Sequence, residues 1–295
     1  MRNKWEHYLW LPLIFSLLLL VVPQFSFVKS SFYADLEFGA VSEIVSLDSY
    51  RVLFSEEIYR NAFFRTLYLS AGATCISLIL ALPTAYSMSR SGRLVASVGL
   101  NAIIAISLVS ISVKLLGLNV MLAGSGVINQ SLIALGLIDT PIQLLNNRIG
   151  VLVGLVQYTL PITILMLYSV MSTIPAQIEE AAHIHGATRS ATFFRLIVPL
   201  ASGGLLNGGL IAFNMCMGAF TSPLILGGGR VLTIPVLIQQ KMIAEAKYSV
   251  AAALSVSLVL FVFAVNLFLG LAISRRQKLS RRRRAWHARL QGEVT

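Results

Sequence analysis

The residues best able to carry chemistry gather in one short segment, residues 172–204, which reads STIPAQIEEAAHIHGATRSATFFRLIVPLASGG. Two adjacent acids, Glu179 and Glu180, follow Pro175 and precede two alanines. A helix that begins after Pro175 places both carboxylates in its first turns, where the positive end of the helix dipole stabilises them. These residue types predict a slim helix that makes contacts, rather than a group that makes or breaks bonds.

Gly186 separates this first helix from a second, amphipathic stretch. A glycine at this position allows a turn or a close backbone approach between two short helices. The following stretch mixes apolar residues with Arg189 and Arg195, and Pro199 interrupts it. The pattern predicts a small helical hairpin at a membrane surface. Two interpretations remain open, which are a docking surface for a partner protein and a simple interfacial connection.

Catalytic and metal-binding signatures are missing from the sequence. No G-x-x-x-x-G-K-[ST] phosphate loop is present, because the glycine run at 227–229 is followed by Arg-Val. The H-E-x-x-H and G-x-S-x-G motifs are also absent. His183 and His185 are two residues apart, so they point to different faces of a helix and predict no metal pair. We therefore expect a chain that is not an enzyme and holds no cofactor or metal.

The composition indicates that these residues are carried by a membrane protein. Of the 295 residues, 56% are hydrophobic and 12% are charged, whereas soluble domains carry about 25% charged residues. Six runs are long enough to cross a bilayer, which takes about 20 mostly apolar residues. The runs are 8–28, 64–88, 94–113, 149–171, 203–221 and 250–273.

Two parts of this map have alternatives. The first run follows Arg2 and Lys4, as a signal peptide does, but it is long and lacks a small-x-small cleavage site, so we expect an uncleaved span. Residues 114–148 are moderately apolar but interrupted by glycines, Asp139 and Pro141. We expect a long outer loop there, with a short and partly re-entrant helix that protein or a water-filled cavity shields.

The charges predict the orientation. With both termini in the cytoplasm, the inner segments hold 14 of the 23 basic residues but only 4 of the 12 acidic ones, which is the positive-inside bias. The predicted organisation is a cytoplasmic N-terminus (1–7), a membrane domain (8–273) with a cytoplasmic loop at 172–202, and a basic cytoplasmic tail (274–295). The basic run at 275–284 suits anionic lipid headgroups and makes a nucleic-acid partner unnecessary.

Polar and aromatic residues inside the apolar runs are candidates for a solute pathway, because hydrocarbon penalises them unless they face a cavity or a partner. No acidic residue lies in the six runs, which argues against a proton-driven carrier. The alternative for each candidate is a hydrogen bond between helices. Tyr158 and Asn214 are the preferred residues of the set, which comprises Gln157, Tyr158, Asn207, Asn214, Phe220 and Thr221.

One spacing in the cytoplasmic loop resembles a known signature. Glu180-Ala181-Ala182, three residues, Gly186, nine residues and then a stretch ending at Pro199 closely resemble the EAA motif of binding-protein-dependent ABC importer permeases, the MetI-like superfamily. The family form is EAA, three residues, G, nine residues and I-x-L-P. This sequence departs from it conservatively, with Leu196 and Val198 at the two aliphatic positions.

The resemblance implies an all-α permease with six transmembrane helices and a cytoplasmic coupling helix, located in a bacterial inner membrane. In that family the loop docks on a separate ATPase, which holds ATP and Mg²⁺. The implied partners are two such ATPase subunits, a second permease of different sequence and a periplasmic solute-binding protein. The implied coupling residues are Glu179, Glu180, Ala181, Ala182 and Gly186.

Three further stretches extend the resemblance. Residues 60–90 resemble the second span of the family with the turn that follows it, and residues 124–137 and 217–230 resemble outer loops of spermidine/putrescine-type permeases. The resemblance favours a polyamine or a similar small organic solute over sugars and peptides. An opine, an amino-acid derivative and ferric iron remain alternative substrates, and a stand-alone secondary carrier or channel and a membrane scaffold remain alternative classes.

Overall fold

The computed structural model describes the backbone of residues 5–35 and 41–292, and the side chains of residues 10, 12–35 and 44–271. The described part is largely helical, and its strands form one small antiparallel sheet. The chain divides into two compact units. One combines Met1–Ser49 with Lys247–Thr295, and the other is Tyr50–Ala246.

The first unit contains two long helices and a hairpin. Helix α1 (Trp5–Ser30) leads into strands β1 (Tyr33–Asp35) and β2 (Val41–Val45), which pair antiparallel, and α14 (Tyr248–Gly292) is the second helix. The carboxylate of Asp35 accepts hydrogen bonds from the backbone amides of Ser249 and Val250, at 2.7 and 3.0 Å. These amides lie in the first turn of α14 and have no partner within the helix, so Asp35 caps the helix from the hairpin.

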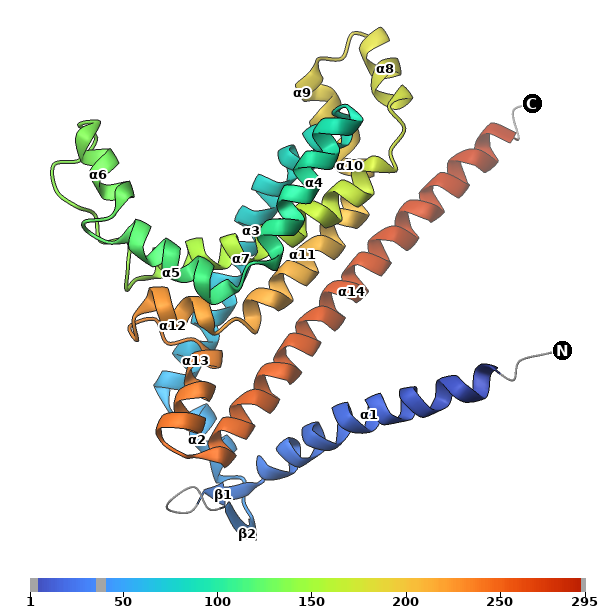
Figure 1. Ribbon diagram of the computed structural model, residues 1–295. Helices are drawn as coiled ribbons and strands as arrows, with labels where there is room; N and C mark the ends of the chain where they lie inside the picture. Colours follow the sequence, from blue (N-terminus) through green and yellow to red (C-terminus); the bar gives the residue numbers. More distant parts are fainter. Residues whose placement is uncertain (1–4, 36–40, 293–295) are drawn as a thin grey trace. The chain divides into compact units, whose positions relative to one another are not determined.

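The second unit is built around three helices, α3 (Glu57–Arg90), α7 (Arg148–Ser172) and α11 (Ser202–Met217), which pack against one another (Figure 1). The buried face of α3 consists mostly of small residues such as Ala73, Ser77 and Ala81. Small side chains allow helix backbones to approach closely, which is how helices associate when lipid surrounds them. A short helix, α2 (Asp48–Ser55), precedes α3.

The region after α3 departs from the predicted span at 94–113. Helix α4 (Arg93–Leu108) ends early, and α5 (Ile111–Leu122) begins after a break at residues 109–110. Lys114 Nζ donates to the carbonyl of Ile106, 3.3 Å away, and so satisfies one of the last carbonyls of α4. A further helix, α6 (Val127–Ala134), follows a turn that includes Gly124 and Gly126. The expected outer loop with a short helix is therefore more helical than predicted.

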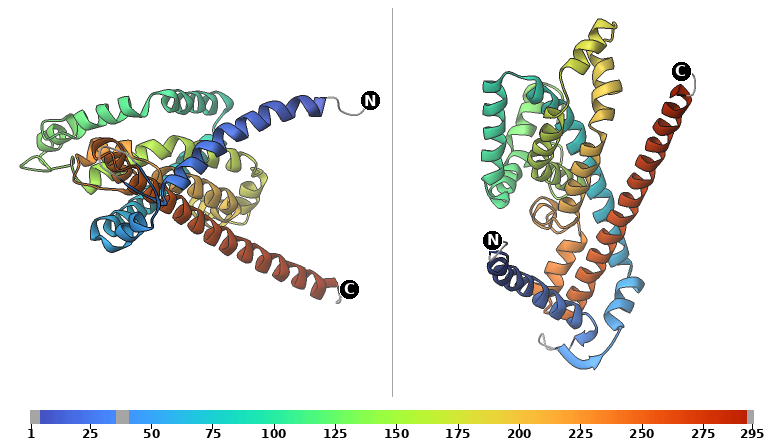
Figure 2. Two further views of the ribbon diagram at one scale, coloured as in Figure 1. Left: turned by 90° about the horizontal axis from the view of Figure 1, so that it is seen from below. Right: turned by 90° about the vertical axis from the view of Figure 1, so that its right-hand side faces the viewer.

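The remaining elements lie at the two ends of this core. Helices α8 (Gln177–Ile184) and α9 (Arg189–Thr192) form a hairpin beyond the end of α3 and α7, whereas α12 (Thr221–Gly227) and α13 (Ile234–Gln239) lie at the other end (Figure 1). The hairpin returns through a π-helical turn, Phe193–Ile197, and α10 (Val198–Leu200) to α11. A second π-helical turn, Gln240–Ala244, follows α13. Figure 2 shows the same elements from two further directions.

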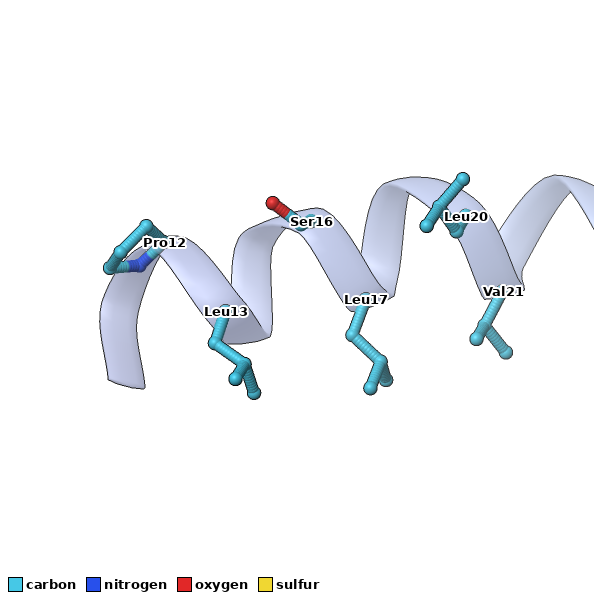
Figure 3. Close-up of a pocket in the computed structure, with 6 residues that line it drawn as sticks. All are labelled: Pro12, Leu13, Ser16, Leu17, Leu20 and Val21. Carbon is cyan, nitrogen blue, oxygen red and sulfur yellow. The ribbon is translucent and has the colours of Figure 1, made fainter. Parts of the chain in front are cut away.

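The described residues include enough long apolar helices for a chain that crosses a membrane several times. Five helical segments are long and apolar enough to cross a bilayer, and a bent pair makes up to six. The five are Pro12–Ser30, Glu57–Arg90, Ile111–Ala134, Arg148–Ser172 and Tyr248–Leu271. The set differs from the predicted one, because Arg93–Leu108 is too short and the α5–α6 region takes its place. One face of α1 carries a shallow apolar pocket lined by residues of that helix alone, which suits lipid chains (Figure 3).

Candidate coupling site

The hairpin segment 172–202 begins as its sequence predicts. Helix α8 starts directly after Pro175 and Ala176, and the amides of Glu179 and Glu180 both donate to the carbonyl of Ala176, at 2.9 and 3.1 Å. Both acids therefore lie in the first turn, where the helix dipole favours negative charge. The two carboxylates nevertheless have different surroundings, since Glu179 is buried and Glu180 is exposed.

Glu179 points toward the end of α3. Its Oε1 lies 2.6 Å from both Nε and Nη2 of Arg90, the last residue of α3. Its Oε2 accepts a 2.6 Å hydrogen bond from the hydroxyl of Tyr86, one turn earlier on the same helix. Arg90 Nη2 also donates to the carbonyl of Ile174, 3.1 Å away, in the connection between α7 and α8. The ion pair thus joins α8 to α3, with side-chain exposures of 11% for Glu179 and 21% for Arg90.

Apolar contacts reinforce this attachment. Ile174 and Ile197 are buried in a cluster with Ala81 and Ala85 of α3 and with Leu167 of α7. The partly buried side chains of the hairpin that pack against this cluster are Ile178 and Phe193. The hairpin therefore has an apolar inner face, which seats it on the core, and an exposed outer face.

The turn between α8 and α9 has the geometry that requires glycine. Gly186 has φ +82°, in the left-handed region. Its amide donates to the carbonyl of His183, and the amide of Ala187 donates to that of Ala182, at 2.9 and 3.0 Å. This pair of bonds is a Schellman motif, which ends a helix through a residue in the left-handed conformation. The predicted turn at Gly186 is therefore present.

The outer face of the hairpin contains four of the five predicted coupling residues. Glu180, Ala181 and Gly186 are exposed and Ala182 is half-buried, whereas Glu179 faces the core. Sequence reasoning missed Ile184, which is 84% exposed, and Phe194, which is 68% exposed. The helical period alone does not identify Ile184, since it lies only about 120° around α8 from the inward Ile178.

The return from the hairpin to the core is irregular. The π-helical turn at Phe193–Ile197 is followed by a 70° bend between Arg189–Leu200 and Ser202–Met217. The ring of Phe193 contacts that of Tyr86, with centroids 4.9 Å apart. π-Helical turns inside helices often mark functional sites. The bend lies at Ala201, two residues after the proline that was expected to break the chain.

The six predicted pathway residues come from α7, α11 and the start of α12, and α7 packs against both of the others. Gln157 and Tyr158 lie on α7, Asn207 and Asn214 on α11, and Phe220 and Thr221 at the start of α12 rather than at the end of the fifth span. None of the six is buried. Thr159, next to Tyr158, is instead fully buried between helices. In the part of the chain that the structure describes, no three His, Cys, Asp or Glu side chains are grouped as metal ligands.

Comparisons with known proteins agree with this architecture. Residues 73–278 match the family described as "Binding-protein-dependent transport system inner membrane component". The spermidine/putrescine transport system permease protein PotB of Haemophilus influenzae is 30% identical over 246 residues, which is 83% of each chain. PotB of Escherichia coli K12 is 28% identical over 82% of this chain and 87% of its own.

The fold also matches solved structures. A bacterial ABC transporter involved in the import of the acidic polysaccharide alginate has a chain that superposes with a TM-score of 0.76 at 18% identity, covering 92% of this chain and 96% of its own. The family match covers most of the chain, and the structural match extends the shared fold to nearly all of it. The chain therefore belongs to the inner-membrane components of binding-protein-dependent transport systems, with the MetI-like fold, and is the permease subunit of an ABC importer rather than an enzyme.

Proposed function

We propose that this permease forms half of a translocation pathway and receives its motion from a separate ATPase that docks on the outer face of the 172–202 hairpin. The observation that carries the proposal is the pairing of a firmly seated inner face with an exposed outer face that holds Glu180, Ala181, Ile184 and Gly186. An apolar side chain as exposed as Ile184 suits a protein partner rather than water. ATP and Mg²⁺ belong to that partner.

The distribution of basic residues supports a cytoplasmic location for the hairpin. Arg90 and Arg93 flank the junction of α3 and α4, and Arg189 and Arg195 lie in the hairpin, so all four are at the same end of the second unit. A cluster of basic residues in short connections marks the cytoplasmic side. In this orientation both termini are cytoplasmic, and the opposite end faces a periplasmic solute-binding protein. The second permease of the pair is a different chain.

The proposed solute is a polyamine or a similar small organic molecule. Support comes from the PotB relatives, which are permease proteins of spermidine/putrescine transport systems. The pathway residues proposed on this chain are Tyr158 and Asn214 first, followed by Gln157, Asn207, Phe220 and Thr221. An aromatic ring such as that of Tyr158 attracts an ammonium group through its π face. Opines, amino-acid derivatives and ferric iron are the alternative solutes.

Docking is tested by adding bulk to the outer face. In a tagged chain expressed with its native partners, Ala181→Trp places a large ring on the exposed side of α8. We expect the amount of ATPase that co-purifies to fall about tenfold or more, as for truncation or blocking of an interface centre. Gly117→Trp is the matched control, because a side chain at Gly117 meets nothing within 4 Å and lies on α5, away from the hairpin. Equal ATPase recovery from both variants would overturn the docking proposal.

The solute is tested on the binding protein that works with this permease. Isothermal titration with spermidine and putrescine should show saturable binding, whereas opines and ferric ion should not bind. Saturable binding of an opine or ferric ion instead would leave the permease assignment in place and replace the solute.

A further inference from the structure

The two adjacent acids of α8 lie about 100° apart around the helix axis, and their surroundings separate their roles. Glu180 is exposed on the outer face, whereas Glu179 is buried against the end of α3. We propose that Glu179 is a positioning residue that fastens the coupling helix to α3 through Arg90 and Tyr86, and that it does not dock the ATPase. This inference rests on the proposed function of the hairpin.

The first argument is that both oxygens of the Glu179 carboxylate already have partners within the chain. Oε1 contacts Nε and Nη2 of Arg90 at 2.6 Å, and Oε2 accepts from the Tyr86 hydroxyl at 2.6 Å. Short, charge-assisted hydrogen bonds of this kind are the strong ones. A carboxylate held in this way, with 11% of the side chain exposed, is poorly placed to meet a partner protein.

The second argument concerns what the contact joins. Arg90 ends α3, and its guanidinium also donates to the carbonyl of Ile174 in the connection from α7. Tyr86 adds a ring contact to Phe193 on the return side of the hairpin, with centroids 4.9 Å apart. One cluster therefore holds both sides of the hairpin to the ends of α3 and α7, two of the three core helices.

The third argument is mechanical. A push on the outer face of α8 moves the core only if α8 cannot slide or tilt independently. The apolar contacts of Ile178 and Phe193 give burial but little direction. The Glu179 carboxylate is instead fixed at both oxygens, Oε1 by Arg90 and Oε2 by Tyr86, which sets its distance from α3 and its orientation. Close-packed helices such as α3 and α7 then carry the displacement onward, since packed interiors deform little. Glu179 thus converts docking into movement of α3.

The experiment uses the complete importer, purified through a tag on this chain and reconstituted in proteoliposomes. Two quantities are measured, which are the amount of ATPase that co-purifies and the stimulation of ATP hydrolysis by the binding protein purified with its native solute. For Glu179→Gln we expect ATPase recovery within about twofold of the unmodified chain and stimulation reduced about tenfold, because a partly buried charge loses its partner. Glu180→Gln, the matched control on the adjacent residue, should instead reduce ATPase recovery.

Rescue separates positioning from general loss of structure. Exchanging the charges, with Arg90→Glu and Glu179→Arg in one chain, should restore part of the stimulation that either single change removes. Tyr86→Phe deletes one hydrogen bond and no charge, so it should lower the stimulation of ATP hydrolysis by a smaller factor than Glu179→Gln. It replaces Glu179→Gln in the experiment if that variant does not assemble. Loss of ATPase recovery from Glu179→Gln equal to that from Glu180→Gln would overturn the proposal, as would unchanged stimulation. If no ATPase co-purifies with the unmodified chain, the proposed docking function of the hairpin is wrong, rather than the proposed role of Glu179.

Discussion

The hydroxyl oxygens of Ser77 on α3 and Thr159 on α7 lie 2.8 Å apart, and both side chains are fully buried. Thr159 Oγ1 also donates to the carbonyl of Leu155 at 3.0 Å, so Ser77 is the donor between the two hydroxyls. The bond joins the two helices that make the most extensive contact in the described structure.

Removing this bond should loosen the α3–α7 contact. Thr159→Val keeps the shape of the side chain but leaves the Ser77 hydroxyl without its acceptor. We expect a loss of about 0.6 kcal/mol, and at most roughly 1.7 kcal/mol, the range for hydrogen bonds between membrane helices. Thermal unfolding in detergent of both single variants and the double variant with Ser77→Ala gives the coupling energy. A double variant that is destabilised by the full sum of the two single variants would show that the bond contributes nothing.

Asn129 should stabilise the connection between α5 and α7. Its side chain is fully buried, donates to the carbonyls of Ala123 and Ile142 at 3.0 and 3.1 Å, and accepts from the Ile142 amide at 2.9 Å. Asn129→Ala removes all three bonds, each of which contributes about 0.5–1.5 kcal/mol, although the Ala123 carbonyl keeps its bond from the Gly126 amide. We expect faster proteolysis and hydrogen exchange across 123–142. The exposed neighbour Gln130, changed to Ala, should leave both rates near those of the unmodified chain.

Gly154 should tolerate no side chain. A Cβ at this position of α7 would lie 2.3 Å from Ser222 Oγ and 2.5 Å from Leu226 Cδ1, both on α12. Gly154→Ala therefore forces α12 away from α7, and overpacking of this kind costs about 1–3 kcal/mol. Gly117→Ala on α5 meets nothing within 4 Å, so it should be neutral or stabilise by up to about 1 kcal/mol through helix propensity. Equal melting temperatures for the two variants would contradict the packing argument.

Gly186 should be required for its backbone conformation rather than for lack of space. A Cβ at Gly186 meets nothing within 4 Å, but φ is +82°. Gly186→Ala should cost about 1–2 kcal/mol, the penalty for an L-residue in the left-handed region. Gly186→Asn should cost less, because asparagine enters that region more readily. Hydrogen exchange of the Ala187 amide reports the turn, and Gly203→Ala, also in open space, is the control.

Lys241 gives a pH-dependent contribution to stability. Its Nζ lies 2.7 Å from Glu245 Oε2, with 17% of the lysine side chain exposed. Burial acts to lower the pKa of Lys241, but the hydrogen bond to Glu245, the interaction with Tyr59 and the charge of Glu245 together outweigh it, so the pKa is raised above 10.5. The stabilisation is therefore complete below pH 10.5 and is lost as the pH rises through the raised pKa.

The change Lys241→Met tests this contribution. At neutral pH we expect it to lower stability by about 1 kcal/mol or less, as for partly exposed ion pairs. Unfolding in detergent as a function of pH should show the difference from the unmodified chain shrinking only in the alkaline range. A difference that disappears near neutral pH would show that another group is responsible.

Local signals predicted the parts of the structure that depend on neighbouring residues. The start of α8 follows from Pro175 and the two acids of the first turn, and the turn at Gly186 follows from a left-handed glycine, so both are encoded within a few residues. The EAA signature predicted the fold for the same reason, because all of its residues lie between Glu180 and Pro199.

Features that depend on distant residues could not be predicted. Nothing near Glu179 indicates that Arg90, 89 positions earlier, meets its carboxylate. The break between α4 and α5 lies in an apolar run, residues 102–113, that is interrupted only by serines, among them Ser110 at the break. Average hydropathy tolerates isolated serines, so it carried the predicted span through residues 109–110. The exposure of Ile184 likewise depends on which face of α8 the core covers.

The cap on α14 gives the chain an order of assembly. The carboxylate of Asp35 is synthesised 214 residues before the amide of Ser249 that it receives. The first turn of α14 therefore depends on a residue that follows the first helix. If α1 and β1 were misplaced, the amides of Ser249 and Val250 would lose their acceptor.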